Sequence, residues 1–338
     1  MINGNSVILQ FGKESAYGTE ATCTRQIQIA SESLKPEYNK VDEGLATGGR
    51  GAGRKSTMGI GTSGSISTLL RPDMAFLIAH AMGVENVSAV TGKSGAYKHV
   101  LTAIGTDETL HLPSATIKVD RKVNKLAYVG QKINQFSIDV SAGAFAKLDI
   151  GFVGKDEIDT GVEMETGLTP SSIKAFKLAQ AKAYVTVDGT KTEIADVDSI
   201  NLTYNNNLDA QVQTTSTGDY YKEAECGVRD VQATMSMIYA QGTEAIRKSL
   251  YKSDKTFSVE LDFVSDELVV AGCPYSLTVS LPCCQMPEAE ANMGGLETLK
   301  QNVTVSVVDD LVHELATFEF VNGESASSIA DTVAKDDD

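Results

Sequence analysis

The sequence predicts a mainly β protein of antiparallel strands arranged in two similar halves, and three observations support this. Apolar and polar residues alternate with a period of two along most patterned segments, which is typical of strands with one buried face. Only two short segments have the pattern of a helix. The order of these elements repeats at about half the length of the 338-residue chain.

The alternation begins at residues 26–34, where Ile27 and Ile29 are separated by polar side chains. It continues in residues 57–69, where Met58, Ile60 and Ile66 alternate with glycine and serine. Further strands are predicted at 112–120, 126–140 and 144–153 in the first half, and at 199–205 and 229–240 in the second.

The two predicted helices each follow one of these strands. Residues 72–82 start with Pro72, which suits a first helical turn, and are followed by Gly83, which favours a C-terminal stop. Residues 243–252 start with Thr243, a suitable N-cap residue.

The order strand, loop, strand, helix therefore occurs twice. In the first half it covers 26–34, 35–56, 57–69 and 72–82, and in the second half 199–205, 206–224, 229–240 and 243–252. Such a repeat predicts an internal duplication. We expect a first domain at 1–160, a linker at 161–175, a second domain at 176–325 and an acidic C-terminal tail at 326–338. Residues 284–301 are interpreted as an insert of the second half alone.

Composition excludes several classes of protein. Forty-five acidic and 29 basic residues give a net charge of −16, which disfavours sequence-neutral nucleic-acid binding through released counterions. No basic start followed by an apolar run predicts a secretory signal, and no apolar stretch approaches the ~18 residues of a membrane helix. The five cysteines form no C-x-x-C pair, which indicates unpaired thiols in a reducing compartment.

Three motifs resemble enzyme signatures, and their context argues against each. GGRGAGRKST at 48–57 has an arginine inside the phosphate-loop motif and precedes a strand instead of a helix. GIGTSG at 59–64 lies inside a strand pattern, and HELAT at 313–317 lacks the second histidine of a zinc helix. With four scattered histidines, we expect no enzyme, no cofactor and no metal site.

The polar faces of four predicted strands share one character: their side chains are small, hydrophilic and either neutral or acidic, and none is lysine or arginine. They comprise Gln26, Gln28, Glu32, Ser63, Ser65, Ser67, Asn201, Thr203, Asn205, Asp230, Gln232, Thr234 and Ser236. One interpretation is an ordinary solvent-facing side of an antiparallel sheet. The other is the wall of a channel that carries a polyanion without binding it.

Two stretches resemble a known family. GKESAYGTEAT at 12–22, the glycine-rich loop at 44–56, SGSIS at 63–67 and the helix before Met82 and Gly83 resemble the first part of the tail tube proteins of long-tailed bacteriophages. Residues 175–211 and CGVRDVQATMSM at 226–237 resemble another part of that family, so the likeness covers nearly all of 1–325. It implies a structural virion protein with β-sandwich domains, each flanked by a short helix.

In that family the inner sheets close into a ring-shaped β-barrel, and stacked rings form a hollow tube for genome ejection. The resemblance implies that the polar faces above line the lumen and that the loops 35–56 and 206–224 contact the next ring. Arg50, Arg54 and Lys55 would then pair with acidic residues there. Two such domains per chain imply a homotrimeric, pseudo-hexameric ring, with a six-subunit ring as the alternative.

The implied partners are other copies of the chain and the tip, terminator and tape-measure proteins of the tail. Viral DNA would pass through without specific binding, and no membrane is involved. The implied location is the virion, with assembly in the host cytoplasm. Two other classes stay open: a distal tail component or adhesin, and a β-rich carbohydrate-binding module, which an aromatic content of 6% without tryptophan disfavours.

Overall fold

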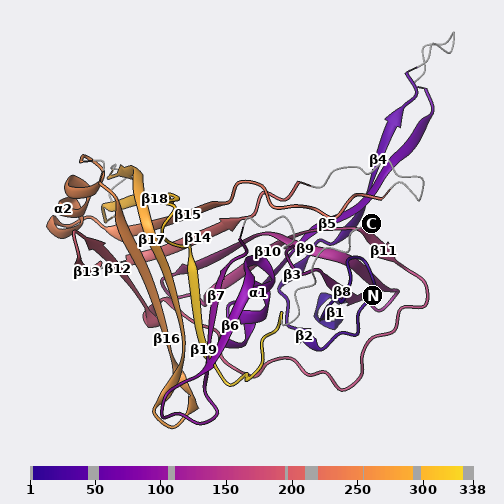
Figure 1. Cartoon of the computed structure of the whole chain (residues 1–338), viewed down its shortest axis with the longest axis horizontal. Helices are drawn as coiled ribbons and strands as arrows, with labels where there is room; N and C mark the ends of the chain where they lie inside the picture. Colours follow the sequence, from indigo (N-terminus) through magenta and orange to yellow (C-terminus); the bar gives the residue numbers. More distant parts are fainter. Residues whose placement is uncertain are drawn as a thin grey trace.

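The computed structural model is mainly β, as the sequence predicts. It describes residues 3–44, 53–105, 111–194, 197–209, 220–253, 255–291 and 298–329. Within these ranges the chain forms nineteen strands, two α-helices and three short 3-10 helices, and Figure 1 shows how they are arranged.

The strands of residues 3–158, here called the N-terminal half, are β1 (Ile8–Lys13), β2 (Arg25–Ile27), β3 (Ser31–Glu32), β4 (Lys35–Asp42), β5 (Lys55–Leu69), β6 (Gly83–Ala89), β7 (Tyr97–Ala103), β8 (Ala115–Asp120), β9 (Lys125–Ser141), β10 (Lys147–Gly154) and β11 (Asp156–Ile158). Those of residues 178–322, the C-terminal half, are β12 (Ala181–Val187), β13 (Thr190–Ile194), β14 (Val197–Asn205), β15 (Asp230–Ile238), β16 (Phe257–Val270), β17 (Cys273–Glu290), β18 (Lys300–Val307) and β19 (Thr317–Asn322). The helices are η1 (Gly4–Ser6), η2 (Pro72–Met74), α1 (Ala75–Met82), η3 (Leu178–Gln180) and α2 (Gln241–Leu250).

One ladder of strands runs through both halves, in the order β4, β5, β10, β9, β14, β15, β18, β17. We call it the wall sheet. The short strand β3 precedes β4 and continues its pairing with β5. Strands β9 and β17 each belong to two ladders. The first part of β9 pairs with β8 and its last part with β10, and the first part of β17 pairs with β16 and its last part with β18. The other strands join the wall sheet through these first parts.

The pairing scheme of the N-terminal half recurs in the C-terminal half. The neighbours β2–β1–β8–β9–β11 correspond to β13–β12–β16–β17–β19, and β4–β5–β10–β9 corresponds to β14–β15–β18–β17. Helix α1 follows β5, and α2 follows β15 at the same place in the order. The hairpin β6–β7 is the main departure, since it follows α1 and pairs through β7 with β19.

Several sequence-based boundaries need correction. The loop predicted at 35–56 contains β4, which pairs with β5 to form a protruding hairpin, here called the arm (upper right in Figure 1). Most of β4 is exposed on both faces, so it lacks the apolar alternation that would have revealed it. The strand predicted at 26–34 is divided between β2 and β3.

The start of the second helix and the supposed insert also differ from expectation. Ala240 is the N-cap of α2, and Thr243 lies inside the first turn, where its Oγ1 accepts a hydrogen bond from the Ala240 N–H at 2.9 Å. The segment 284–301 contains the end of β17 and the start of β18, so it corresponds to the β9–β10 connection of the N-terminal half. Its polar, proline-containing sequence conceals a strand with one exposed face.

The expected linker lies along the outer strands as an extended strap. The side chain of Gln10 donates to the Glu165 carbonyl at 2.7 Å and accepts from the Glu165 N–H at 2.8 Å. Lys118 Nζ bonds the Glu163 carbonyl at 3.1 Å and a carboxylate oxygen of Glu165 at 3.2 Å. Side-chain bonds to backbone groups thus order a segment that forms no strand in 161–175.

The chain after β19 is fixed by a buried cluster on β6 and β7. The Glu85 carboxylate accepts hydrogen bonds from Ser327 Oγ (2.9 Å), Ser328 N–H (2.6 Å) and Ser328 Oγ (2.8 Å). His99 Nδ1 lies 2.7 Å from Glu85, and its Nε2 lies 2.9 Å from the Glu324 carbonyl oxygen. Of the expected acidic tail, residues 330–338 lie outside the described residues.

This cluster favours a charged imidazole, because both ring nitrogens face oxygen acceptors. Burial is the largest single influence and lowers the pKa of His99, but the hydrogen bond and charge of Glu85, together with the Glu324 carbonyl and carboxylate, outweigh it and raise that pKa above its ordinary value. Burial likewise raises the pKa of Glu85, and the bonds from His99 and Ser328 outweigh it and lower that pKa to about 2.

His99→Gln is expected to lower the free energy of unfolding by about 3 kcal/mol at pH 6, because it leaves a buried carboxylate without its charged partner. Because the pKa of His99 is higher in the folded than in the unfolded protein, its charged form stabilises the fold. This contribution is complete below the unfolded-state pKa of ~6.5 and is lost as the pH rises through the folded-state pKa. The difference between the two proteins in urea unfolding should therefore shrink from pH 6 to pH 9. The control is His313→Gln, which removes an exposed pair with Asp310 and should change little. An equal loss for His99→Gln at both pH values would contradict the prediction.

Candidate functional site

One face of the wall sheet is polar across seven strands. Residues directly opposite each other in neighbouring strands point to the same side of a sheet, so the registers define cross-strand rows. The central row contains Ser67, Asp149, Ser137, Thr203, Gln232, Ser306 and Gln285, in that spatial order. Together with the rows beside it, this surface is called the polar face.

Three further rows complete the polar face. On one side lie Ser65, Gly151, Gln135, Asn205 and Asp230; on the other lie first Lys147, Asp139, Asn201, Thr234, Thr304 and Glu288, and then Ser141, Ser199, Ser236, Asn302 and Glu290. Every one of these residues is partly or fully exposed. The surface is therefore continuous over strands that belong to both halves of the chain.

The opposite face of the same strands is apolar and buried. Phe136 of β9 stacks on Tyr204 of β14 with ring centroids 5.2 Å apart, and its edge meets Phe318 of β19 at 5.4 Å. Burial raises the pKa of the Tyr204 hydroxyl to about 12, so that it stays neutral. Burial of this face fixes the register, because a slip by one residue would turn the apolar side chains outward.

The polar face carries more negative than positive charge. Its four rows contain the carboxylates of Asp139, Asp149, Asp230, Glu288 and Glu290 and one lysine, Lys147. Hydrogen bonds between its side chains are few and long, such as Asn201 Nδ2 to Asp139 at 3.4 Å. Such a surface is well hydrated and offers phosphate groups no cluster of cations.

Ten of the thirteen residues singled out in the sequence lie together on this side of the wall sheet. They are Ser63, Ser65, Ser67, Asn201, Thr203, Asn205, Asp230, Gln232, Thr234 and Ser236. The structure adds positions on β9, β10, β17 and β18 that sequence reasoning missed. Ser137 and Asp149 could have been predicted from the alternation in 126–140 and 144–153. Glu288 and Glu290 could not, because 284–301 was interpreted as an insert and not as a strand.

The other three residues lie elsewhere. Glu32 is opposite the buried Ile66, so it points to the other side of the sheet, where it forms a two-fold bond with Arg121 at 2.9 Å. Gln26 pairs with Gln10 of β1, outside the wall sheet, and Gln28 follows β2 before the chain joins the wall at β3. The alternation cannot be extended from β2 to β3, because the chain changes sheet partner between them.

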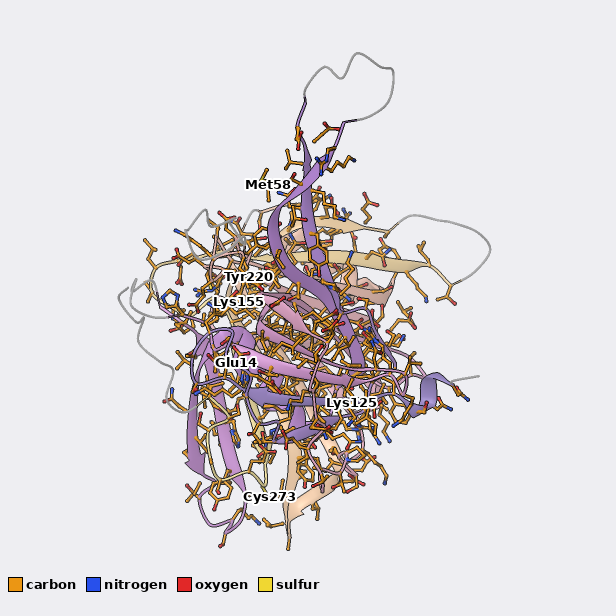
Figure 2. All side chains as sticks on the ribbon, turned by 90° about the vertical axis from the view of Figure 1, so that its right-hand side faces the viewer. Glu14, Met58, Lys125, Lys155, Tyr220 and Cys273 are labelled. Atoms are coloured by element: carbon orange, nitrogen blue, oxygen red, sulfur yellow. The ribbon has the colours of Figure 1, made fainter. Side chains whose placement is uncertain are left out.

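The arm carries the predicted contact loop. Lys55 opens β5 opposite Asp42, and the Arg54 carbonyl accepts from the Glu43 N–H at 3.1 Å; Arg50 lies outside the described residues. Large apolar side chains are exposed along it: Tyr38 by 54%, Met58 by 50% and Val41 by 45%. Figure 2 shows Met58 on the arm, away from Glu14 and Lys125 in the body of the molecule.

The second predicted contact loop, 206–224, starts beside the polar face and returns to the base of the arm. The Tyr221 N–H donates to the Ile60 carbonyl at 2.9 Å, and Lys132 Nζ reaches the Ala224 carbonyl at 3.0 Å. Residues 210–219 lie outside the described residues.

In the described part of the chain, no group of three or more histidine, cysteine, aspartate or glutamate side chains is arranged to hold a metal ion. None of the helices described is both long and apolar enough to cross a membrane.

Among the described residues, the first and last strands of this two-faced sheet have no partner on their outer sides, and such open edges can pair with the strands of another chain. The sequence profile of a family described as "Phage tail tube protein" matches residues 4–307. The chain therefore belongs to the phage tail tube family and is a structural tail tube protein.

Two solved structures are similar to parts of this chain. One is the virion of a native gene transfer agent particle, with 9% identity, a TM-score of 0.29 and coverage of 38% of this chain and 91% of the other. The second is the SPP1 tail tube, with 11% identity, a TM-score of 0.30 and coverage of 44% and 79%. No curated protein matches the sequence.

Neighbouring substitutions on β9 should separate the two faces of the wall. Phe136→Ala is expected to lower the free energy of unfolding by about 3–5 kcal/mol, because it opens a cavity between Tyr204 and Phe318. Ser137→Ala, one residue away on the polar face, should change it by less than ~0.5 kcal/mol. Urea titration followed by circular dichroism measures both, and similar losses for the two variants would contradict this two-faced arrangement.

Proposed function

We propose that this chain polymerises into stacked rings, and that the polar face lines the lumen of the resulting tube, through which the viral genome is ejected. The observation that carries the proposal is the continuity of that face over both halves, with open strands at its two ends. Among the described residues, no strand pairs with the outer edge of β3 and β4, and none with the outer edge of residues 285–290 of β17. Joining these edges between copies would close the sheet into a barrel.

We favour three copies per ring. The repeated pairing scheme supports a tandem duplication with a first domain at 1–160, a linker at 161–175 and a second domain at 176–325, so each chain supplies two equivalent four-stranded parts of the wall. Three copies would give ~24 strands, and a separation of ~4.8 Å with a tilt of ~40° gives a backbone diameter of about 50 Å. That leaves room for a DNA duplex inside the side chains, whereas six copies would double the diameter.

The charge of the polar face would let DNA pass through the lumen without being bound. Binding of nucleic acid gains much of its free energy when cationic groups replace the counterions of the phosphates. One lysine among five carboxylates in the four rows provides no such gain, so DNA would slide along a hydrated and weakly repulsive wall.

The arm is the element that would join one ring to the next. It extends beyond the body of the subunit and combines exposed apolar side chains with the basic residues Arg50, Arg54 and Lys55. A chain with a net charge of −16 offers many carboxylates to such a basic tip. Tip, terminator and tape-measure proteins would be the further partners in the virion tail, with assembly in the host cytoplasm and no enzymatic step.

Concentrated, purified full-length protein should form hollow rings or tubes in negative-stain electron microscopy, with threefold or pseudo-sixfold end views. A chain that remains monomeric both alone and with a tail-tip extract would contradict the proposal and favour a distal tail component or adhesin. End views with strict sixfold symmetry and twice the diameter would indicate six copies.

Reversing the charges of the arm should allow rings to form but hinder their stacking into tubes. The triple variant Arg50→Glu, Arg54→Glu and Lys55→Glu is expected to form rings that stack poorly, because like charges would face each other between rings. The control reverses three exposed lysines around α2: Lys248, Lys252 and Lys255. Tube length measured by microscopy should fall for the arm variant alone, and tubes of normal length would rule out this role.

A further inference from the structure

We propose that the joint between neighbouring copies repeats the joint already present inside each chain, so that the end of β17 pairs antiparallel with the start of β4 of the next copy and Glu290 stands opposite Lys35. This inference rests on the proposed ring and adds the partner strand, its direction and its register.

The internal joint connects the last wall strand of the N-terminal half with the first wall strand of the C-terminal half. Strand β9 pairs antiparallel with β14 over seven residues, from Gln135 opposite Asn205 to Ser141 opposite Ser199. Within this ladder, Ser137 is opposite Thr203 on the polar face.

Strand β17 occupies the place of β9 in the second half. Gln135 and Ser137 are opposite Gly151 and Asp149 of β10. In the same way, Glu288 and Glu290 are opposite Thr304 and Asn302 of β18.

The irregularities of the two ladders agree as well. The β8–β9 register shifts between Ala115 and Ile117, and the β16–β17 register shifts between Phe257 and Val259 at the corresponding place. The correspondence therefore extends to single residues, and Glu290 holds the position of Ser137.

Strands β3 and β4 together occupy the place of β14. Ser31 is opposite Ser67 of β5 as Ser199 is opposite Ser236 of β15. Further along, Lys35 is opposite Ser63 as Thr203 is opposite Gln232. The next strands fix the alignment, because Ser67 faces Asp149 and Ser236 faces Asn302. Lys35 therefore holds the position of Thr203.

Replacing each residue of the internal β9–β14 joint by its equivalent gives the residue pairs expected at the joint between copies. The pair Ser137–Thr203 becomes Glu290–Lys35, and the pair Gln135–Asn205 becomes Glu288–Glu37. Lys35 already lies 3.6 Å from Glu37 in its own chain, so in the joint its ammonium group would stand among three carboxylates. Opposite charges directly across a ladder stabilise pairing and select the register.

The edge that receives the neighbour is protected in the isolated chain. The Leu34 N–H donates to Glu32 at 3.1 Å, and its carbonyl accepts from Arg121 and the Tyr128 hydroxyl at 3.0 Å each. Pro36 has no N–H to offer. Such features disfavour pairing with unrelated strand edges. A correctly aligned copy would replace the Glu32 contact and gain the Glu290–Lys35 pair in exchange.

Disulfide trapping tests the register directly. Opposite residues of an antiparallel pair have Cα atoms about 4.5–5.5 Å apart, within the range of ~4.4–6.8 Å that a disulfide spans. The Lys35→Cys and Glu290→Cys double variant, oxidised in its assembled state, should give linked dimers and trimers in non-reducing gels. The unsubstituted protein under the same oxidation is the baseline for its five natural cysteines.

The matched control is Glu37→Cys with Glu290→Cys, which shifts the pair by two residues and should give at least tenfold less crosslinked product. If rings form and the shifted pair crosslinks better, or neither pair crosslinks, the proposed joint is wrong while the ring stands. If microscopy shows no rings for the unsubstituted protein, the proposed function itself fails, and the joint with it.

A charge exchange provides a second measurement without cysteines. Lys35→Glu should reduce the yield of closed rings at least severalfold, because Glu290, Glu288 and Glu37 would then face another carboxylate. Adding Glu290→Lys should restore most of that yield. Unchanged circular dichroism of both variants confirms that they fold, and failure of the second substitution to rescue ring yield would overturn the pairing.

Discussion

The period-two division of the wall strands into a polar and an apolar side is the constraint on which the rest of the structure depends. Burial of Phe136, Tyr204 and their neighbours requires that the alternate residues point away from the core. Seven strands from the two halves obey the same division, so their exposed residues join into one surface. Hydrophobic burial on one side therefore positions the hydrophilic surface on the other.

Much of this arrangement is predictable from local sequence. The strands at 57–69, 199–205 and 229–240 and the last part of 126–140 alternate clearly, because each has one buried and one exposed side, and ten of the thirteen selected residues do share a face. Strand β4 was missed for the opposite reason: it is exposed on both sides, so its sequence carries no periodic signal.

Other features depend on contacts between distant segments. Glu32 was misplaced because the chain changes its sheet partner between β2 and β3, and on the side where Glu32 then lies it binds Arg121, 89 residues away. The strap at 161–175 has no strand pattern, yet the buried side chains of Gln10 and Lys118 order it through its backbone. The cluster of Glu85 and His99 joins a hairpin of the N-terminal half to the segment 324–328 after β19, and neither local pattern reveals the other. Such pairings become visible only when the fold is known.

The duplicated pairing scheme also has a consequence for how a tube can change over time. In a ring of identical single-domain subunits, any substitution appears at every joint at once. In the proposed three-copy ring, half of the joints would be covalently tethered and would keep a fixed local concentration, while the other half would form between separate molecules. The two kinds of joint could therefore carry different residues, such as Ser137 and Thr203 at one and Glu290 and Lys35 at the other. A docking protein with threefold symmetry would meet the same surface at each of the three contacts of that ring.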